Sequence, residues 1–142
     1  MKKITVAVDS FKGSLSSQEV ADAFEVGAKR VLPHCEVRKV SVADGGEGTV
    51  DSLVQMLDGE YVTPVVADPL MRPIEARYGI VDGGRVAVME MSAASGLPLL
   101  KPEERNPLKT TTYGTGEMIA DALTRGCRKF LIGIGGSATN DA

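Results

Sequence analysis

Residues 3–42, KITVAVDSFKGSLSSQEVADAFEVGAKRVLPHCEVRKVSV, have the pattern of a strand, a loop, a helix and a second strand. The run at the start is mostly apolar and β-branched, as in a short strand, and a polar loop follows it. Ser16 and Glu19 have the spacing of a helix capping box, and apolar residues then recur at helical spacing until Pro33. Residues 36–42 predict the next strand. Two strands joined by a helix are expected to be parallel.

The same order continues outward along the chain. Residues 43–49, ADGGEGT, precede apolar positions at helical spacing, which predict a helix that ends near Gly59. Residues 61–67 then predict a third strand. This repetition predicts an α/β fold with a parallel sheet, in which ligands lie at the carboxyl ends of the strands. We therefore expect the loops of residues 9–16 and 44–49 at that edge.

The pattern changes beyond residue 67. Residues 68–73 are rich in breakers, and alternating apolar residues on both sides of residues 82–84 predict an antiparallel hairpin. We therefore predict a domain boundary near residue 70. Residues 1–70 would begin a parallel α/β domain, and residues 71–142 would begin a second α/β domain that contains the hairpin. The sequence further predicts a loop, a helix and a strand, at residues 92–107, 115–125 and 129–134.

The composition excludes several classes of function. A net charge of −3 without a basic stripe argues against nucleic-acid binding, and so does an aromatic content of 4% without Trp. No apolar run approaches the roughly 18 residues of a membrane span, and no apolar signal-peptide core follows the N-terminus. Cys35 and Cys127 form no CxxC pair, which is typical of reduced thiols. We expect a cytoplasmic protein.

Glycine accounts for 16 of the 142 residues, and much of it lies in five segments that also carry hydroxyl, amide or carboxylate side chains. Glycine lets the backbone approach a ligand, and successive N–H groups form anion-binding nests. Lys12 could meet a phosphate or a carboxylate, and Asp44 or Glu47 could bind Mg²⁺ or act as a base. A solvated loop and ordinary helix caps are the alternatives. Residues 133–138 also match a loose dinucleotide fingerprint, which leaves a nicotinamide oxidoreductase as the least favoured interpretation.

The five segments are DSFKGSL at residues 9–15, ADGGEGT at 43–49, EMSAASGL at 90–97, TTYGTGE at 111–117 and GIGGSATND at 133–141. Together, and in this order, they resemble the glycerate kinase family that includes bacterial glycerate 2-kinases. The resemblance implies ATP-dependent phosphorylation of D-glycerate to 2-phosphoglycerate. It also implies a Rossmann-like, parallel three-layer domain interrupted by a second α/β domain. Family chains continue far beyond the last segment, so we expect this chain to be an N-terminal fragment.

The resulting hypothesis assigns catalytic roles to Lys12 and Asp44, with Asp44 as metal ligand or base, and assigns Mg²⁺ to Asn140 and Asp141. The expected partners are glycerate and ATP, with neither nucleic acid nor membrane. The alternative hypothesis is a non-catalytic remnant that at most binds an anion. The predicted substrate- and phosphate-binding residues are Ser10, Gly45, Gly46, Glu47, Gly48, Thr49, Ser92, Ser95, Gly96, Thr112, Gly114, Thr115, Gly116, Gly135, Gly136, Ser137 and Thr139.

Overall fold

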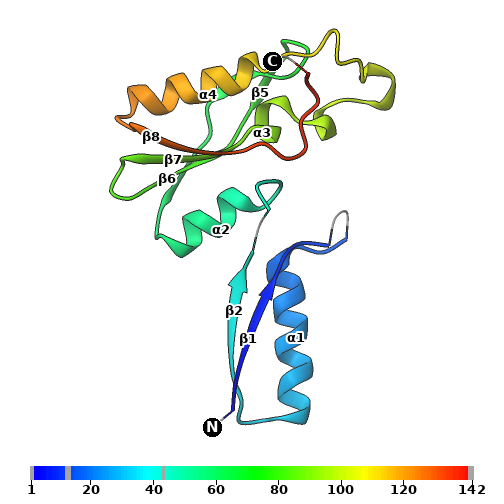
Figure 1. The fold of residues 1–142 in the computed structure, drawn as a ribbon, viewed down its shortest axis with the longest axis vertical. Coiled ribbons are helices and arrows are strands. Elements are labelled where there is room, and N and C mark those ends of the chain that lie inside the picture. Colours follow the sequence, from blue (N-terminus) through cyan, green and yellow to red (C-terminus); the bar gives the residue numbers. More distant parts are fainter. Residues whose placement is uncertain (1, 12–13, 43, 141–142) are drawn as a thin grey trace. The chain divides into compact units, whose positions relative to one another are not determined.

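The structure, a computed structural model, describes residues 2–11, 14–42 and 44–140. It contains two compact units, Met1–Asp44 and Gly45–Ala142. Helices are combined with parallel and antiparallel sheets, so the predicted α/β class is confirmed (Figure 1). Among the helices of the described residues, none has both the length and the apolar character required to cross a bilayer.

The first unit is the predicted strand, helix and strand. β1 (Lys3–Val8) and β2 (Glu36–Ser41) pair in parallel, and α1 (Ser17–Val31) connects them. Ser16 caps α1, because its hydroxyl accepts the N–H of Glu19 while the Glu19 carboxylate accepts the N–H of Ser16 at 2.8 Å. The capping box, the helix and the parallel pair are therefore confirmed.

The second unit is built on a four-stranded sheet in the order β3-β6-β7-β8. Its strands are β3 (Glu60–Val62), β6 (Tyr78–Val81), β7 (Val86–Glu90) and β8 (Lys129–Gly133). β6 is antiparallel to both β3 and β7, whereas β8 is parallel to β7. Asp82 and Gly83 turn between β6 and β7 with positive φ. The predicted hairpin is thus confirmed.

The prediction that residues 61–67 form a third strand of the parallel sheet is wrong. The chain is interrupted there by Pro64, which has no N–H with which to continue a ladder. Two short strands result: β3 pairs with β6, and β4 (Val65–Ala67) pairs antiparallel with β5 (Pro73–Glu75). The Pro64 carbonyl instead accepts the N–H of Ala76 at 3.0 Å.

The helices of this unit are α2 (Thr49–Met56), α3 (Ser92–Ser95) and α4 (Tyr113–Thr124). α2 and α4 cover opposite faces of the four-stranded sheet (Figure 1). Met89 of β7 lies in the core cluster that contains Met118 of α4, and the neighbouring Val88 lies in the cluster that contains Val54 of α2. The period-2 alternation of a strand thus fills a core on both sides of the sheet.

The compact units divide between Asp44 and Gly45, whereas the sequence predicted a domain boundary near residue 70. The division falls there because Val50 and Val54 of α2 pack on Val81 and Val88 of the sheet. As a statement about domains, the boundary near residue 70 stays a prediction. The loop predicted at residues 92–107 contains α3 and two 3₁₀ turns, Leu97–Leu99 and Pro102–Glu104.

Candidate functional site

Three of the five predicted segments lie together in the second unit. The N–H of Gly135 donates to the carbonyl of Gly45 at 3.1 Å, which joins the last segment to the loop before α2. The N–H of Leu97 donates to the carbonyl of Gly136 at 2.9 Å, and the N–H of Ala138 donates to the carbonyl of Ser95 at 2.9 Å. The loop of residues 45–49, the segment of residues 92–97 and the loop of residues 133–140 therefore form one cluster, hereafter the glycine-loop cluster.

Close packing of backbone on backbone accounts for several of its glycines. A Cβ at Gly133 would overlap the carbonyl oxygen of Gly45, and a Cβ at Gly135 would lie 2.8 Å from the Cα of Gly46. A Cβ at Gly96 would likewise overlap the carbonyl of Ser92. The glycine spacing that predicted ligand approach thus also lets the loop before α2 meet the last segment, and lets the segment of residues 92–97 turn closely on itself.

The hydroxyl side chains in and beside this cluster fall into two groups. Ser95 is fully buried, and its hydroxyl lies 2.7 Å from that of Thr115, so these two predicted binding residues bond to each other behind the loops. Thr110, which is not among the predicted binding residues, donates to the carbonyl of Ala138 at 2.7 Å and holds the last loop. Ser137 and Thr139 lie nearer the surface, with their hydroxyl oxygens 2.9 Å apart.

The loop before α2 combines local bonds with an exposed acid. Thr49 donates its hydroxyl to the carbonyl of Gly46 at 2.8 Å, and Gly48 takes a φ of 93° as the N-cap of α2. Glu47 is exposed between them. The backbone of this loop therefore turns tightly.

Glu90 is a residue of this region that the sequence interpretation did not count among the site residues. It ends β7, and its Oε1 accepts the N–H of Val50 at 2.8 Å. Burial raises the pKa of Glu90 and outweighs the backbone N–H groups at the start of α2, which lower it, while nearby Asp51 raises it further. A charged residue at the end of an otherwise apolar strand, VAVME, was the available signal.

The remaining predicted binding residues of this unit are Ser92, inside the cluster, and three residues at the start of α4. Ser92 lies beside Gly136, whose added Cβ would be 3.4 Å from that of Ser92. Gly114, at the start of α4, packs so closely on β4 that a Cβ would overlap the carbonyl of Ala67. Gly116 has open space around its Cβ position, and Thr112 is the N-cap residue of α4.

The predicted metal site is described only in part. Asn140 is exposed, and Asp141 lies outside the described residues. Within the described part of the chain, no group of three or more His, Cys, Asp or Glu side chains could hold a metal ion. Mg²⁺ in kinase sites takes most of its ligands from water and phosphate.

The first unit carries the remaining predicted residues. Ser10 follows β1 and donates its N–H to the Asp9 carboxylate at 2.7 Å. Asp44 is exposed at the end of this unit, and Lys12 lies outside the described residues. Ser10 thus lies just beyond the carboxyl end of a parallel strand, as predicted.

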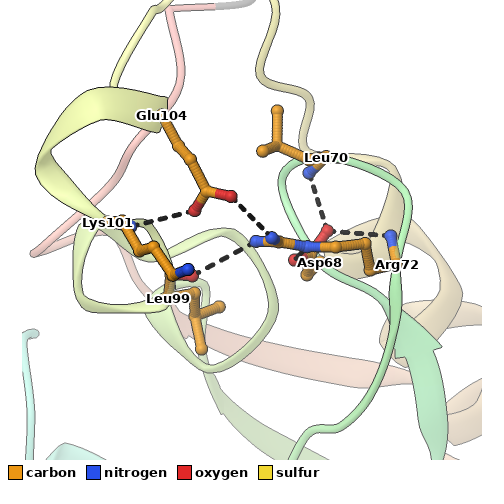
Figure 2. A network of polar contacts seen from close by, with 6 residues as sticks. All are labelled: Asp68, Leu70, Arg72, Leu99, Lys101 and Glu104. Carbon is orange, nitrogen blue, oxygen red and sulfur yellow. Dashed lines mark hydrogen bonds and ion pairs between the residues drawn. The ribbon is translucent and has the colours of Figure 1, made fainter.

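Another carboxylate, Asp68, has a buried side chain and lies just after β4. Its Oδ1 accepts the N–H groups of Leu70 and Arg72 at 2.7 and 2.9 Å, and its Oδ2 accepts Nε of Arg72 at 2.5 Å (Figure 2). Burial would raise the pKa of Asp68, but the Arg72 and Leu70 N–H groups and the Arg72 guanidinium lower it overall.

The same arginine extends this network to the 3₁₀ turns. Its Nη1 donates to Glu104 at 2.8 Å, and its Nη2 lies 3.4 Å from the carbonyl of Leu99 (Figure 2). Glu104 in turn accepts the N–H of Lys101 at 3.0 Å. The ion-pair network thereby fastens the segment that follows α3 to the turn after β4.

Comparison with known proteins gives a consistent result. The sequence profile described as the Glycerate kinase family matches residues 4–142. A glycerate kinase of Bacillus subtilis (strain 168) is 55% identical over 98% of this chain and 36% of the relative, and a glycerate 2-kinase of Escherichia coli (strain K12) is 48% identical over the same shares. A solved structure from Salmonella typhimurium LT2, assigned as glycerate kinase 2, aligns with a TM-score of 0.83 at 48% identity, over 99% of this chain and 37% of that one. The chain therefore spans about a third of the length of the relatives that it matches.

Proposed function

Because the chain belongs to the glycerate kinase family, we propose that it is part of an ATP-dependent kinase that phosphorylates D-glycerate to 2-phosphoglycerate. The observation that carries this proposal is the glycine-loop cluster, in which backbone segments from three parts of the sequence meet. The name of the Escherichia coli relative, a glycerate 2-kinase, supports the choice of the 2-hydroxyl.

The residues of the cluster suit the binding of anionic groups. Phosphoryl transfer depends mainly on positioning and on neutralising charge. In this proposal the backbone of Gly45, Gly46, Gly135 and Gly136 binds phosphate or the glycerate carboxylate, because glycine-rich turns present N–H groups without side-chain obstruction. The hydroxyls of Ser137 and Thr139 add donors beside them.

The proposal also assigns roles to charged groups. Lys12 would neutralise negative charge on the phosphoryl group or the substrate, and Asp44 would accept the proton of the substrate hydroxyl. ATP would supply the γ-phosphoryl group and Mg²⁺ would neutralise its oxygens, with Asn140 and Asp141 as the proposed protein ligands. Two ligands suffice for such a role, because magnesium in phosphoryl-transfer sites keeps several waters.

A second candidate function is the binding of glycerate or phosphate without turnover. It is favoured by the extent of the match, since the chain covers 36% of the length of the Bacillus subtilis relative. Residues beyond that share would then be needed for catalysis. For the polypeptide of 142 residues alone, we expect this second behaviour.

A coupled assay of ADP release from ATP with D-glycerate, together with calorimetric titration of D-glycerate into the purified chain, separates these candidates. Turnover that is lost in Asp44→Asn would establish the kinase in this chain. Binding without turnover would support the second candidate, and Asp44→Asn in a longer relative would then test the proposed base. Neither binding nor turnover would contradict both candidates.

A further inference from the structure

The Glu90 carboxylate ties together two parts of the glycine-loop region that are 40 residues apart in the sequence. Its Oε1 lies 2.8 Å from the N of Val50, in the first turn of α2. The first N–H groups of a helix have no partner within the helix, and a carboxylate beside them also complements the helix dipole. Glu90 therefore fixes the start of α2 to the end of β7.

The helix that Glu90 caps has no local cap of its own. Its N-cap is Gly48, which has no side chain to offer, whereas α1 is capped by the hydroxyl of the adjacent Ser16. Glycine also loses more conformational freedom on folding than other residues, so a loop with glycine at 45, 46 and 48 needs restraint from elsewhere. The long-range bonds from Glu90 supply that restraint at one end of the loop.

The other end of the same loop contacts the last glycine segment. The carbonyl of Gly45 accepts the N–H of Gly135 at 3.1 Å, and a Cβ at Gly133 would overlap that carbonyl. A small displacement of the loop before α2 would therefore displace the segment of residues 133–135 as well. The two contacts, at Val50 and at Gly45, together determine where the loop backbone lies.

We infer that Glu90 is a positioning residue for the proposed glycerate site, which holds residues 48–50 and thereby sets the backbone of Gly45 and Gly46 against residues 133–135. This inference rests on the proposed function of the glycine-loop cluster. Glu90 already accepts the N–H of Val50 in the first turn of α2. A bound carboxylate or phosphate is consequently directed to the loops and away from that helix end.

The test compares Glu90→Gln with a matched control, Glu117→Gln, in the purified chain. Glu117 is also half-buried and accepts a distant backbone N–H, that of Ala67 at 2.7 Å, but it holds α4 to β4. We expect Glu90→Gln to raise the Kd for D-glycerate about tenfold and to shift the amide resonances of residues 48–50, because it removes hydrogen bonds to a charged acceptor. Glu117→Gln should leave the Kd close to that of the wild type.

The outcomes distinguish this inference from the function on which it rests. A folded Glu90→Gln variant that binds D-glycerate as tightly as the wild type would overturn the positioning role and leave the glycerate site standing. A wild-type chain that binds neither D-glycerate nor phosphate would overturn the proposed site, and the positioning role with it. An equal loss of binding in Glu117→Gln would also overturn the inference, because the effect would then be general.

Should Glu90→Gln fail to fold, the wild type provides the test. Asp51 on α2 is a charged group that acts on Glu90, and its own carboxylate lies 2.7 Å from the guanidinium of Arg77. The ¹³C resonance of the Glu90 carboxyl reports its protonation, and we expect the Kd for D-glycerate to rise as the pH falls through that midpoint. In Asp51→Asn the midpoint and the rise in Kd should move together to lower pH. If the Kd for D-glycerate does not change with pH around the Glu90 titration midpoint, in the wild type and in Asp51→Asn alike, the inference is overturned.

Discussion

Asp68 and Glu90 are two carboxylates at ends of strands in the same unit, and the protein stabilises them in different ways. The side chain of Asp68 is 3% exposed and is paired with Arg72, which also reaches Glu104. Glu90 is held by backbone N–H groups of α2, and the charge that bears most on its pKa is the like charge of Asp51. The pKa of Asp68 is lowered and that of Glu90 is raised.

The difference shows two ways of restraining a loop. The ion pair of Asp68 and Arg72, with its backbone hydrogen bonds, fastens the segment after α3. No ligand is proposed there, so this network contributes to stability alone. The glycine loop is fastened instead by a backbone N–H that donates to one carboxylate. An added cation there would attract the anionic ligand that we propose, and would compete with the loop for it. The predictions that follow test whether this division between a stability element and a site element is real.

The largest effect on stability is expected from Asp68→Ala. It leaves the N–H groups of Leu70 and Arg72 without their acceptor and removes the partner of the Arg72 guanidinium. We expect the free energy of unfolding to fall by about 3 kcal/mol, as measured by urea denaturation. Glu104→Gln is the control at the outer end of the same network, and it should cost about 1 kcal/mol or less. Equal losses in the two variants would contradict the special role of the buried acid.

A smaller effect is expected beside Asp68, where α4 approaches β4. Gly114→Ala places a Cβ against the carbonyl of Ala67 and should lower the free energy of unfolding by about 2 kcal/mol. Gly116→Ala, on the same helix, meets open space and should raise it by up to about 1 kcal/mol, because alanine favours the helix. Thermal unfolding of the pair measures both signs, and destabilisation by both substitutions would rule out the close approach as the cause.

The pH dependence of stability should have opposite signs for the two carboxylates. Because the pKa of folded Asp68 is lowered from 3.8, its contribution is present above that value and is lost as the pH falls through the folded pKa. Because the pKa of folded Glu90 is raised from 4.5, its contribution is full below that value and is lost as the pH rises through the folded pKa.

The measurement is urea denaturation at several pH values, from acid to neutral. The cost of Asp68→Asn should grow with rising pH, and the cost of Glu90→Gln should shrink. Slopes of the same sign would contradict the contrast between the two sites.

Local patterns were enough to predict much of this fold. The capping box at Ser16 and Glu19 and the hairpin around residues 82–84 depend on neighbouring residues, and the structure has both. Residues 61–67 were assigned to the wrong sheet, because the partner of a strand depends on distant residues and Pro64 divides this one.

The candidate site was predictable as segments but not as an arrangement. Glycine and hydroxyl patterns pointed to the loops that meet at Gly45, Gly135 and Ser95. Their mutual packing, which explains Gly133 and Gly135 by backbone contact, requires three dimensions. The role of Glu90 was hidden for the same reason, since its acceptor bonds reach a helix 40 residues earlier.

The central claim is that the three loops form one site for glycerate. The most direct measurement is the titration of ¹⁵N-labelled chain with D-glycerate, followed by amide chemical shifts. We predict saturable shifts with one Kd at residues 45–49, 92–97 and 133–140, reproduced in Glu117→Gln. Absence of any shift, or shifts confined to residues outside these loops, would contradict the claim.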